Sequence, residues 1–569
     1  MAECAAVRSE PFSQFQCIQR IAPQLVVVLA LVALRLVAYF SAGGLWRDEV
    51  HSVNMATLPI DDLFFVLTND SIPMCWQSLL RTWVFLFGSS DAAVRSLGLV
   101  IGLTTIPAIW WSMRQFGISF PWWVLVLFGL DPSLMIFGGE VRGYGLGIIT
   151  FFLLVGTAWR TLQQPSGWQW CGLVVISLMA VQSSFTNCFL LAATLIACGV
   201  VALRRGRISL CVGMMMVGIL AAMSMVPYAI YVAPRLTRVV NLVHDPVPFL
   251  LPLQVFMKTY QWGGLVRGWL GVAVGLLGFS ELLRQLFLAK RDQATASTPD
   301  QDLVVFLPVF FWVGTAGFWF YMRFLGVQTA NWYHLPWMAL LAITTELGMR
   351  LWSQQQPERQ RLTMRVATMG ALLIAIEVVP QLQFRLTTTD LIARDLSQKV
   401  RSGDLVIVTP WYVGITFGRY YQGVAEWTNL PNVDHIDHHL AYEQQKEKVM
   451  PWPSPQGIQQ ELQKIDATLQ AGGRVWWVGP FKLLPPGKSP LILSGAPDPQ
   501  YGWSESAYLT SWQQIAIAKM QSIGVTVRPW AMPRPKGVNP NENPAVFLVE
   551  RSTSPALPVA SLNSETQRE

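Results

Sequence analysis

The chain has 569 residues, of which 52% are hydrophobic and only 13% are charged. Soluble domains carry roughly 25% charged residues, so this composition excludes an ordinary soluble globular protein and indicates a membrane protein. The net charge of +7 does not indicate a nucleic acid partner, because basic residues in such proteins mainly set the orientation of the loops.

Long apolar runs follow one another along the first 385 residues. About 20 apolar residues suffice for a helix to cross a bilayer. The first run follows a stretch longer than the usual charged n-region of a signal sequence, so we interpret it as an uncleaved span. The pattern predicts about eleven transmembrane helices. They are expected at 21–41, 95–113, 121–138, 144–159, 168–183, 187–203, 210–232, 266–288, 303–322, 334–349 and 366–382.

Basic residues gather in alternate connections between these runs, from Arg8 and Arg114 to the arginines between 350 and 365. Positively charged loops stay on the cytoplasmic side. The N-terminus is therefore expected in the cytoplasm, and everything after about residue 385 is expected on the outer face. Because we find no eukaryotic sorting signal, we expect a multi-pass protein of a bacterial inner membrane with a periplasmic C-terminal domain.

The first outer loop, at 42–94, contains the apolar stretch "PMCWQSLLRTWVFLFG" at 73–88. It is short and bounded by proline and glycine, and a crossing here would invert every later loop. Trp76 and Trp83 suit the headgroup region of a membrane. We therefore expect an interfacial helix that lies along the bilayer surface.

The composition changes at about residue 385, where Pro, Gly and polar residues become more frequent. Short β-like runs, "DLVIVTP", "RVWWVGP" and "AVFLVER", alternate with helical patterns such as "GIQQELQKIDATLQAG". The fold class predicted is an α-helical polytopic membrane protein with a C-terminal soluble α/β domain. The boundaries are 1–384 for the membrane domain and 385–569 for an extracytoplasmic α/β domain with a disordered tail.

Two acidic residues, Asp48 and Glu49, follow the first span in "GGLWRDEVHSVNMA". Carboxylates are common where a chain leaves a membrane, so the pair alone is weak evidence for a site. The interpretation as a functional site is stronger because Glu140, Arg142 and Tyr144 are expected on the same outer face as the acidic pair. Charged residues near a bilayer are costly and favour a functional hypothesis. The alternative is that Glu140 and Arg142 pair with loop charges or extend to the interface.

Four stretches in order resemble the GT-C glycosyltransferases, in particular the protein O-mannosyltransferases and the bacterial aminoarabinose transferases of lipid A (glycosyltransferase family 39 type). They are "LWRDEVHS", the stretch from 70 to 117, "GGEVRGYGLG" and "NWYHLPWMALLAI", and the likeness covers about the first 345 residues. In that family a sugar moves from a polyprenyl-phosphate carrier to an acceptor on the outer side. The resemblance implies that the acidic pair supplies the catalytic base.

The chemistry requires one base, because the lipid phosphate is a good leaving group and needs no protonation. We expect Asp48 to take the proton of the acceptor hydroxyl, with Glu49 orienting the acceptor or Asp48. Cationic donors should stabilise the departing phosphate. The candidates are Arg142, Arg323 and His334, although His334 would equally suit a histidine bonded to a carbonyl at the membrane edge.

Further residues match the family pattern. Glu140, Arg142 and Tyr144 match its Glu-x-Arg-x-Tyr motif, and Tyr333 belongs to its late motif; all are candidates for binding the donor phosphate or substrate. Arg95 matches a recurring arginine, which we expect to brace the first outer loop.

The sequence departs from the family at two places. Relatives carry a basic residue before Pro-Pro, where this chain has Ser71, Ile72 and Pro73, and an arginine where this chain has Trp332. Both changes concern recognition of the donor, so the sugar and the lipid stay open.

Neither metal nor cofactor is predicted. The seven cysteines contain no CxxC pair. The run "NVDHIDHHL" at 432–440, with His435, His438 and His439, would place ligands near one ion if it were helical, but a solvated loop is the favoured interpretation.

The predicted function is therefore inverting transfer of a sugar from a polyprenyl-phosphate donor to a hydroxyl of a protein, lipid or polysaccharide. One alternative is a transporter or flippase of a lipid-linked glycan, whose charges would line a pathway. Transporters often show two related halves, and we see no internal repeat. A third interpretation makes the outer domain a binding module on a degenerate anchor.

Overall fold

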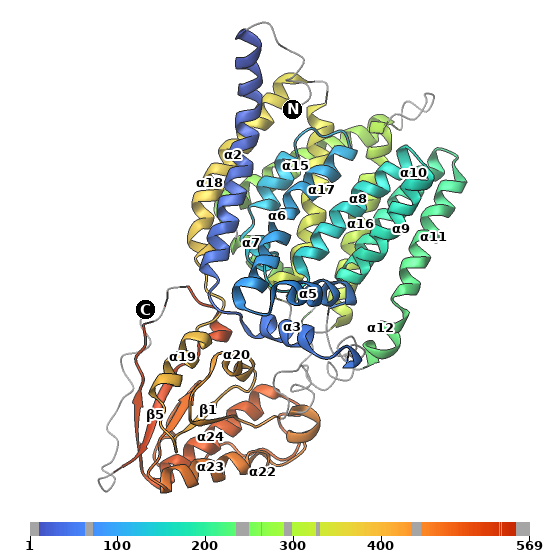
Figure 1. The fold of residues 1–569 in the computed structure, drawn as a ribbon. Helices are drawn as coiled ribbons and strands as arrows, with labels where there is room; N and C mark the ends of the chain where they lie inside the picture. The colour runs from blue at the N-terminus through green and yellow to red at the C-terminus, as the bar shows by residue number, and fades with distance from the viewer. Residues whose placement is uncertain are drawn as a thin grey trace. The chain divides into compact units, whose positions relative to one another are not determined.

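The structure is a computed structural model that describes residues 11–62, 72–234, 248, 250–262, 264–289, 299–325, 330–354, 356–433, 445–533, 535 and 537–552 (Figure 1). It divides into two compact units. The membrane unit comprises Met1–Gly43 and Ser52–Arg385, and the α/β unit comprises Gly44–His51 and Leu386–Glu569.

The short segment Gly44–His51, called the 44–51 segment below, differs from the sequence-based boundaries, which assign it to the membrane domain. It belongs to the α/β unit because its backbone packs there. The amide of Leu45 donates to the hydroxyl of Tyr420 over 2.6 Å. Gly44 lies so close to Asp390 that a Cβ atom at this glycine would meet the Asp390 side chain at 2.7 Å.

The membrane unit is helical, and its first and last long helices, α2 and α18, lie side by side (Figure 1). Its elements are α2 (Pro11–Ser41), most of α3 (Arg47–Thr57), η1 (Ile60–Asp62), α5 (Met74–Phe87), α6 (Asp91–Gln115), η2 (Val124–Gly129), α7 (Pro132–Phe137), α8 (Tyr144–Gln163), α9 (Gly167–Ser183), α10 (Asn187–Arg204), α11 (Ile208–Ser224), α12 (Val226–Tyr231), α14 (Leu251–Trp262), α15 (Leu265–Ala289), α16 (Pro299–Leu325), η3 (Asn331–His334), α17 (Leu335–Ser353) and α18 (Pro357–Leu382).

Seven of the helices in the described part of the chain are long and apolar enough to cross a membrane, and α11 is a shorter apolar helix. These helices confirm the predicted class of polytopic helical membrane protein. The sequence predicts about eleven spans, more than the seven helices of this kind in the described residues. The seven are Ile21–Ser41, Asp91–Gln115, Tyr144–Gln163, Asn187–Arg204, Leu265–Phe287, Pro299–Arg323 and Pro357–Leu382.

The structure divides the expected span at 121–138 into η2 and α7. Asp131 caps α7 by accepting a hydrogen bond from the amide of Ser133 at 2.8 Å, and Pro132 begins the new helix. A proline is favourable at the first helical position because its missing N–H is not needed there. The expected span at 210–232 is likewise divided into α11 and α12 beside Pro227.

The helix expected at the membrane interface is α5, and its bounds agree with the predicted stretch within one residue. In Figure 1 it runs across the direction of α8 and α9, and it packs against α6 and α9. Trp76 is fully buried, whereas Phe85 near its C-terminal end is 86% exposed. This one-sided burial is what a helix lying on a surface requires.

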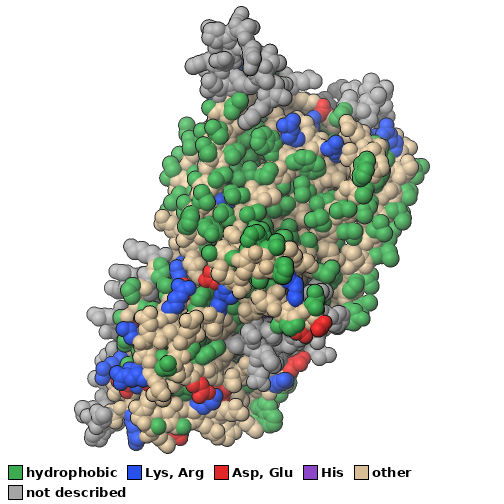
Figure 2. All heavy atoms as spheres, viewed as in Figure 1, with side chains coloured by type: hydrophobic (Ala, Val, Ile, Leu, Met, Phe, Trp, Pro, Cys, Tyr) green, Lys and Arg blue, Asp and Glu red, His purple; other side chains and the backbone are tan. Residues whose placement is uncertain are grey.

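The surface of the membrane unit is largely apolar on the face shown in Figure 2. Helices α15 and α18 expose large hydrophobic side chains along their outer sides, such as Trp269, Leu276 and Ile376. In a protein surrounded by water such a surface would cause association. It suits contact with lipid instead.

Charged residues inside the membrane unit pair with neighbouring helices. The guanidinium of Arg35 donates to the carbonyl groups of Leu134 and Met135 at the end of α7. Glu377 accepts hydrogen bonds from the first amides of α15. Arg267 forms an ion pair of 2.5 Å with Asp131, and both side chains are almost completely buried. These contacts satisfy polar groups where water is absent.

The α/β unit contains a five-stranded sheet of order β2-β1-β3-β5-β4. Strands β2, β1 and β3 are parallel, and β5 is antiparallel to β3 and β4. The elements are α19 (Thr389–Lys399), β1 (Leu405–Val408), α20 (Val413–Tyr420), β2 (Glu426–Asn429), η4 (Gln445–Val449), α22 (Ser454–Gly457), α23 (Gln459–Gln470), β3 (Val475–Val478), α24 (Glu505–Ile523), β4 (Val525–Pro529), η5 (Pro540–Glu542) and β5 (Val546–Arg551).

Helices cover both faces of this sheet, so β1 and β3 are apolar on both sides. Leu405 and Ile407 of β1 join the core beneath α23 and α24. Val406 and Val408 join the opposite core beneath α19 and α20. This alternation explains why the runs "DLVIVTP" and "RVWWVGP" are almost continuously apolar, and it confirms the predicted soluble α/β class.

Candidate functional site

The acidic pair lies in the first turn of α3, within the 44–51 segment. Glu49 is completely buried, and its carboxylate accepts a hydrogen bond from the amide of Trp46 at 3.3 Å. This is the contact of a capping box, in which an acidic residue at the third helical position reaches back to the N-cap amide. Glu49 therefore has a clear structural role at the start of the helix.

Asp48 has a different environment from Glu49. Its carboxylate accepts a hydrogen bond from Nε of Arg47 at 3.1 Å, and its side chain keeps 13% exposure. The first turn of a helix stabilises negative charge, and so does the neighbouring guanidinium. Asp48 is thus a carboxylate that keeps some solvent exposure, whereas Glu49 is completely buried.

The Glu140–Tyr144 turn lies between α7 and α8, and glycines allow its close packing. Gly98 of α6 contacts the carbonyl of Gly139 so tightly that any side chain at position 98 would collide with it. Glu140 and Arg142 are buried. Nη1 of Arg142 donates to the hydroxyl of Ser52 over 3.0 Å.

Ser52 belongs to α3 and comes one helical turn after Asp48 and Glu49. Residues three and four apart share one face of a helix. The structure therefore connects Arg142 to Ser52 of α3 within the membrane unit, although the two residues are far apart in sequence. Ser52 stands within the stretch "LWRDEVHS", but no pattern in the sequence singles it out.

A cavity of about 160 Å³ lies beside this turn in the membrane unit. It brings together Pro73, the first turn of α8 with Tyr144, the turn between α9 and α10, Tyr321 of α16, and Tyr333 of η3. Three phenolic hydroxyl groups and the serine and threonine of the α9–α10 turn thus line one space. Such a mixture of aromatic surface and hydroxyl groups suits a polar small molecule such as a carbohydrate. The polar lining residues that the sequence analysis did not single out are Ser183, Ser184, Thr186, Asn187 and Tyr321.

Gly143 allows the walls of this cavity to approach each other. A Cβ atom there would meet Ile72 at 2.8 Å and the carbonyl of Ser183 at 3.2 Å. We expect Gly143→Ala to destabilise the protein by about 1–3 kcal/mol through overpacking. The measurement is the unfolding midpoint in detergent. Gly275→Ala is the matched control, because a Cβ atom at Gly275 meets nothing within 4 Å; equal midpoints for the two variants would contradict the expectation.

The remaining predicted residues lie at different places. Arg95 donates to the carbonyl of Gly43, near the start of the first outer loop, at 3.2 Å. Arg323 is exposed in the last turn of α16. His334 is fully buried, with its ring between those of Phe256 and Phe318 at 5.9 and 5.7 Å. His334 therefore does not line the cavity, whereas the adjacent Tyr333 does.

Trp332 occupies the place of the family arginine. Its ring packs against Phe137 at 5.1 Å and Tyr144 at 6.3 Å, and it lines the cavity. The residue therefore offers an aromatic surface instead of a positive charge. The other departure, Ser71, lies outside the described residues, as do His435, His438 and His439. Within the described ranges, no group of three or more potential metal ligands occurs.

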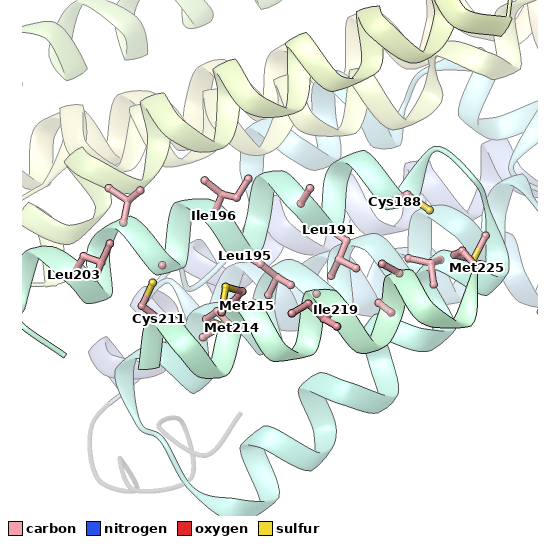
Figure 3. A pocket seen from close by; sticks show the side chains of 17 residues that line it. Cys188, Leu191, Leu195, Ile196, Leu203, Cys211, Met214, Met215, Ile219 and Met225 are labelled. Carbon is pink, nitrogen blue, oxygen red and sulfur yellow. The ribbon is translucent and has the colours of Figure 1, made fainter. Parts of the chain in front are cut away.

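A second, larger hollow of about 560 Å³ lies along α10 and α11 (Figure 3). Every residue that lines it is apolar, small or a cysteine. The labelled side chains come from two adjacent helices, with Leu191 and Leu195 on α10 and Met214 and Ile219 on α11 (Figure 3). This groove suits hydrocarbon and offers no acid or base for chemistry.

No protein-family model matches the chain, and no curated protein matches its sequence. Among solved structures, the chain is similar to ArnT from Cupriavidus metallidurans bound to undecaprenyl phosphate, with 12% identity, a TM-score of 0.45, and coverage of 94% of this chain and 99% of that chain. It is also similar to the oligosaccharyltransferase of Archaeoglobus fulgidus, with 10% identity, a TM-score of 0.44, and coverage of 82% and 70%. Both are glycosyltransferases of the GT-C fold.

Proposed function

We propose that this protein is an inverting glycosyltransferase that moves a sugar from a polyprenyl-phosphate donor to a hydroxyl acceptor at the outer face of a bacterial inner membrane. The observation that carries the proposal is the hydrogen bond from Arg142 to Ser52. It joins the Glu-x-Arg-x-Tyr motif to Ser52, the last residue of the stretch "LWRDEVHS", within the membrane unit.

Asp48 acts as the general base in this proposal. It is the more accessible carboxylate of the pair, and it lies in the first turn of a helix, where negative charge is stabilised. The acceptor oxygen attacks the anomeric carbon while its proton passes to Asp48, and the lipid phosphate leaves with the bonding electrons. A single displacement of this kind inverts the anomeric configuration.

The other residues of the site have supporting roles. Arg142 and Arg323 are the proposed cationic partners of the donor phosphate, where charge increases as the bond breaks. Tyr144, Tyr321 and Tyr333 line the cavity and supply hydroxyl groups for the sugar. Glu140 and His334, which are buried, are proposed to hold the site rather than to contact the reacting atoms.

The test is turnover by the purified full-length protein in nanodiscs. A panel of polyprenyl-phosphate sugars is offered with simple hydroxyl acceptors, and release of polyprenyl phosphate and the anomeric configuration of the product are measured. The expected result is time-dependent release with inversion for at least one sugar. A product that keeps the donor configuration would refute the single displacement.

A transport assay distinguishes the alternative function. The same labelled lipids are placed in one leaflet of vesicles that contain the protein, and their appearance in the other leaflet is followed. Protein-dependent movement across the bilayer without sugar release would favour a flippase over the transferase.

A further inference from the structure

Helix α20 contacts the 44–51 segment at both of its ends. At the C-terminal end, the hydroxyl of the buried Tyr420 accepts the hydrogen bond of 2.6 Å from the amide of Leu45. At the N-terminal end, the guanidinium of Arg47 lies over the ring of the N-cap residue Tyr412, 4.9 Å from its centroid. Both contacts fall within the α/β unit and just before Asp48 in the chain. The segment is therefore held at two points beside the proposed base.

The contact at Arg47 continues directly to Asp48. The guanidinium that lies over Tyr412 also donates from Nε to Oδ1 of Asp48 at 3.1 Å. Because a guanidinium is planar and its donors point in fixed directions, a ring that holds its plane also restricts the direction of the Nε–H group. An unbroken series of contacts thus runs from the Tyr412 ring to the carboxylate.

Helix α20 is itself fixed within the α/β unit, where it packs against α19 and β1. The ring of Trp411 meets that of Tyr412 edge-on at 5.9 Å, and its indole N–H donates to Glu505 of α24 at 3.1 Å. At the other end, the guanidinium of Arg394 from α19 lies over the ring of Tyr420 at 5.1 Å. Both tyrosines are therefore held by neighbours before they contact the segment.

We propose that Tyr420 and Tyr412 are positioning residues, through which α20 fixes the segment that carries Asp48. The inference rests on the proposed function, because it takes Asp48 as the base. A general base must meet the proton of the acceptor within a narrow range of distance and direction. The two tyrosines restrict Leu45 and Arg47, so that Asp48 populates the reactive conformation more fully.

Tyr420→Phe removes the hydroxyl group and keeps the ring. We expect kcat to fall roughly threefold to tenfold, the factor by which one hydrogen bond shifts an equilibrium between held and released conformations, with KM for the donor unchanged. Tyr421→Phe is the matched control, because the hydroxyl of this next residue donates to the carbonyl of Ala425 at 2.9 Å and not to the segment. Equal values of kcat for the two variants would overturn the role of Tyr420.

Tyr412 is tested by asking whether an aromatic ring is sufficient. Tyr412→Leu removes the ring under Arg47 and should lower kcat roughly threefold. Tyr412→Phe keeps the ring and should recover the kcat of the wild type. If the phenylalanine variant were as slow as the leucine variant, the contact between the ring and Arg47 would not be what positions Asp48.

Combined variants distinguish positioning of the base from a purely structural role. If Tyr420 acts through Asp48, then Tyr420→Phe should have no further effect on the residual kcat of Asp48→Asn, because the base that it positions is already lost. A smaller fraction of folded protein would instead lower the activity by the same factor in both backgrounds. Equal factors would therefore contradict the inference.

A measurement that needs no turnover separates this inference from the proposed function. In the full-length protein at one fixed pH, hydrogen exchange of the Leu45 amide should be faster in Tyr420→Phe than in Tyr421→Phe, because this amide loses its acceptor. Unchanged exchange would refute the hold of α20 on the segment. Faster exchange in a protein that turns over no donor would refute the proposed function alone.

Discussion

Asp48→Asn is expected to lower kcat at least 100-fold, with the fold intact. Loss of a general base typically costs 10²- to 10⁴-fold, and asparagine cannot accept the proton of the acceptor. The substitution preserves the shape of the side chain and leaves Glu49 to cap α3. The measurement is release of polyprenyl phosphate under saturating donor, because an effect on the chemical step appears in kcat.

Two further variants make this prediction specific. Glu49→Gln weakens the capping contact with the Trp46 amide, so we expect a loss of about 1 kcal/mol in stability and a smaller loss in kcat than for Asp48→Asn. Asp61→Asn changes an exposed acid of η1 and should behave as the wild type. If Glu49→Gln were the more damaging change, the assignment of the base would have to be reversed.

Asp131→Asn should reduce the stability of the membrane unit by about 3–5 kcal/mol, because it leaves Arg267 as a buried charge without its counterion. Asparagine is also a good N-cap, so the cap of α7 is retained and the loss reports the charge. Arg267 keeps its hydrogen bonds to the carbonyl groups of Leu127 and Tyr260, which are too weak to replace a full negative charge.

Unfolding midpoints in mixed micelles measure this effect. Asp300→Asn is the matched control, because Asp300 pairs with Arg350 where both side chains are partly exposed, and an exposed pair contributes about 0–1 kcal/mol. The double variant Asp131→Asn with Arg267→Met removes both charges and should recover part of the stability. Equal midpoints for Asp131→Asn and Asp300→Asn would contradict the importance of the buried pair.

Patterns within one element were predictable from the sequence, whereas contacts between distant elements were not. Strands β1, β3 and β5 and helix α23 follow from runs of suitable length and period. Strands β2 and β4 were missed because they are short edge strands, with polar or exposed residues such as Glu426 and Arg528. The break between η2 and α7, just before Pro132, was not predicted because the residues before and after it are both apolar.

The same distinction holds for the candidate site. The acidic pair and the Glu140–Tyr144 motif were visible as motifs, but the hydrogen bond from Arg142 to Ser52 depends on how α3 meets the turn after α7. The different environments of Asp48 and Glu49 also depend on side-chain geometry. Leu45 and Tyr420 are separated by most of the chain, so only the fold could reveal their hydrogen bond.

The packing of the 44–51 segment has a consequence for modularity. A chain that ended at Arg385 would retain every apolar helix of the membrane unit, yet it would lose the residues that hold Leu45 and Arg47. The C-terminal unit is therefore not an appendage that recombination could exchange freely for another domain. Any replacement domain would need a surface that binds the eight residues of the 44–51 segment. Changes in the C-terminal unit and changes in this segment would therefore have to be compatible.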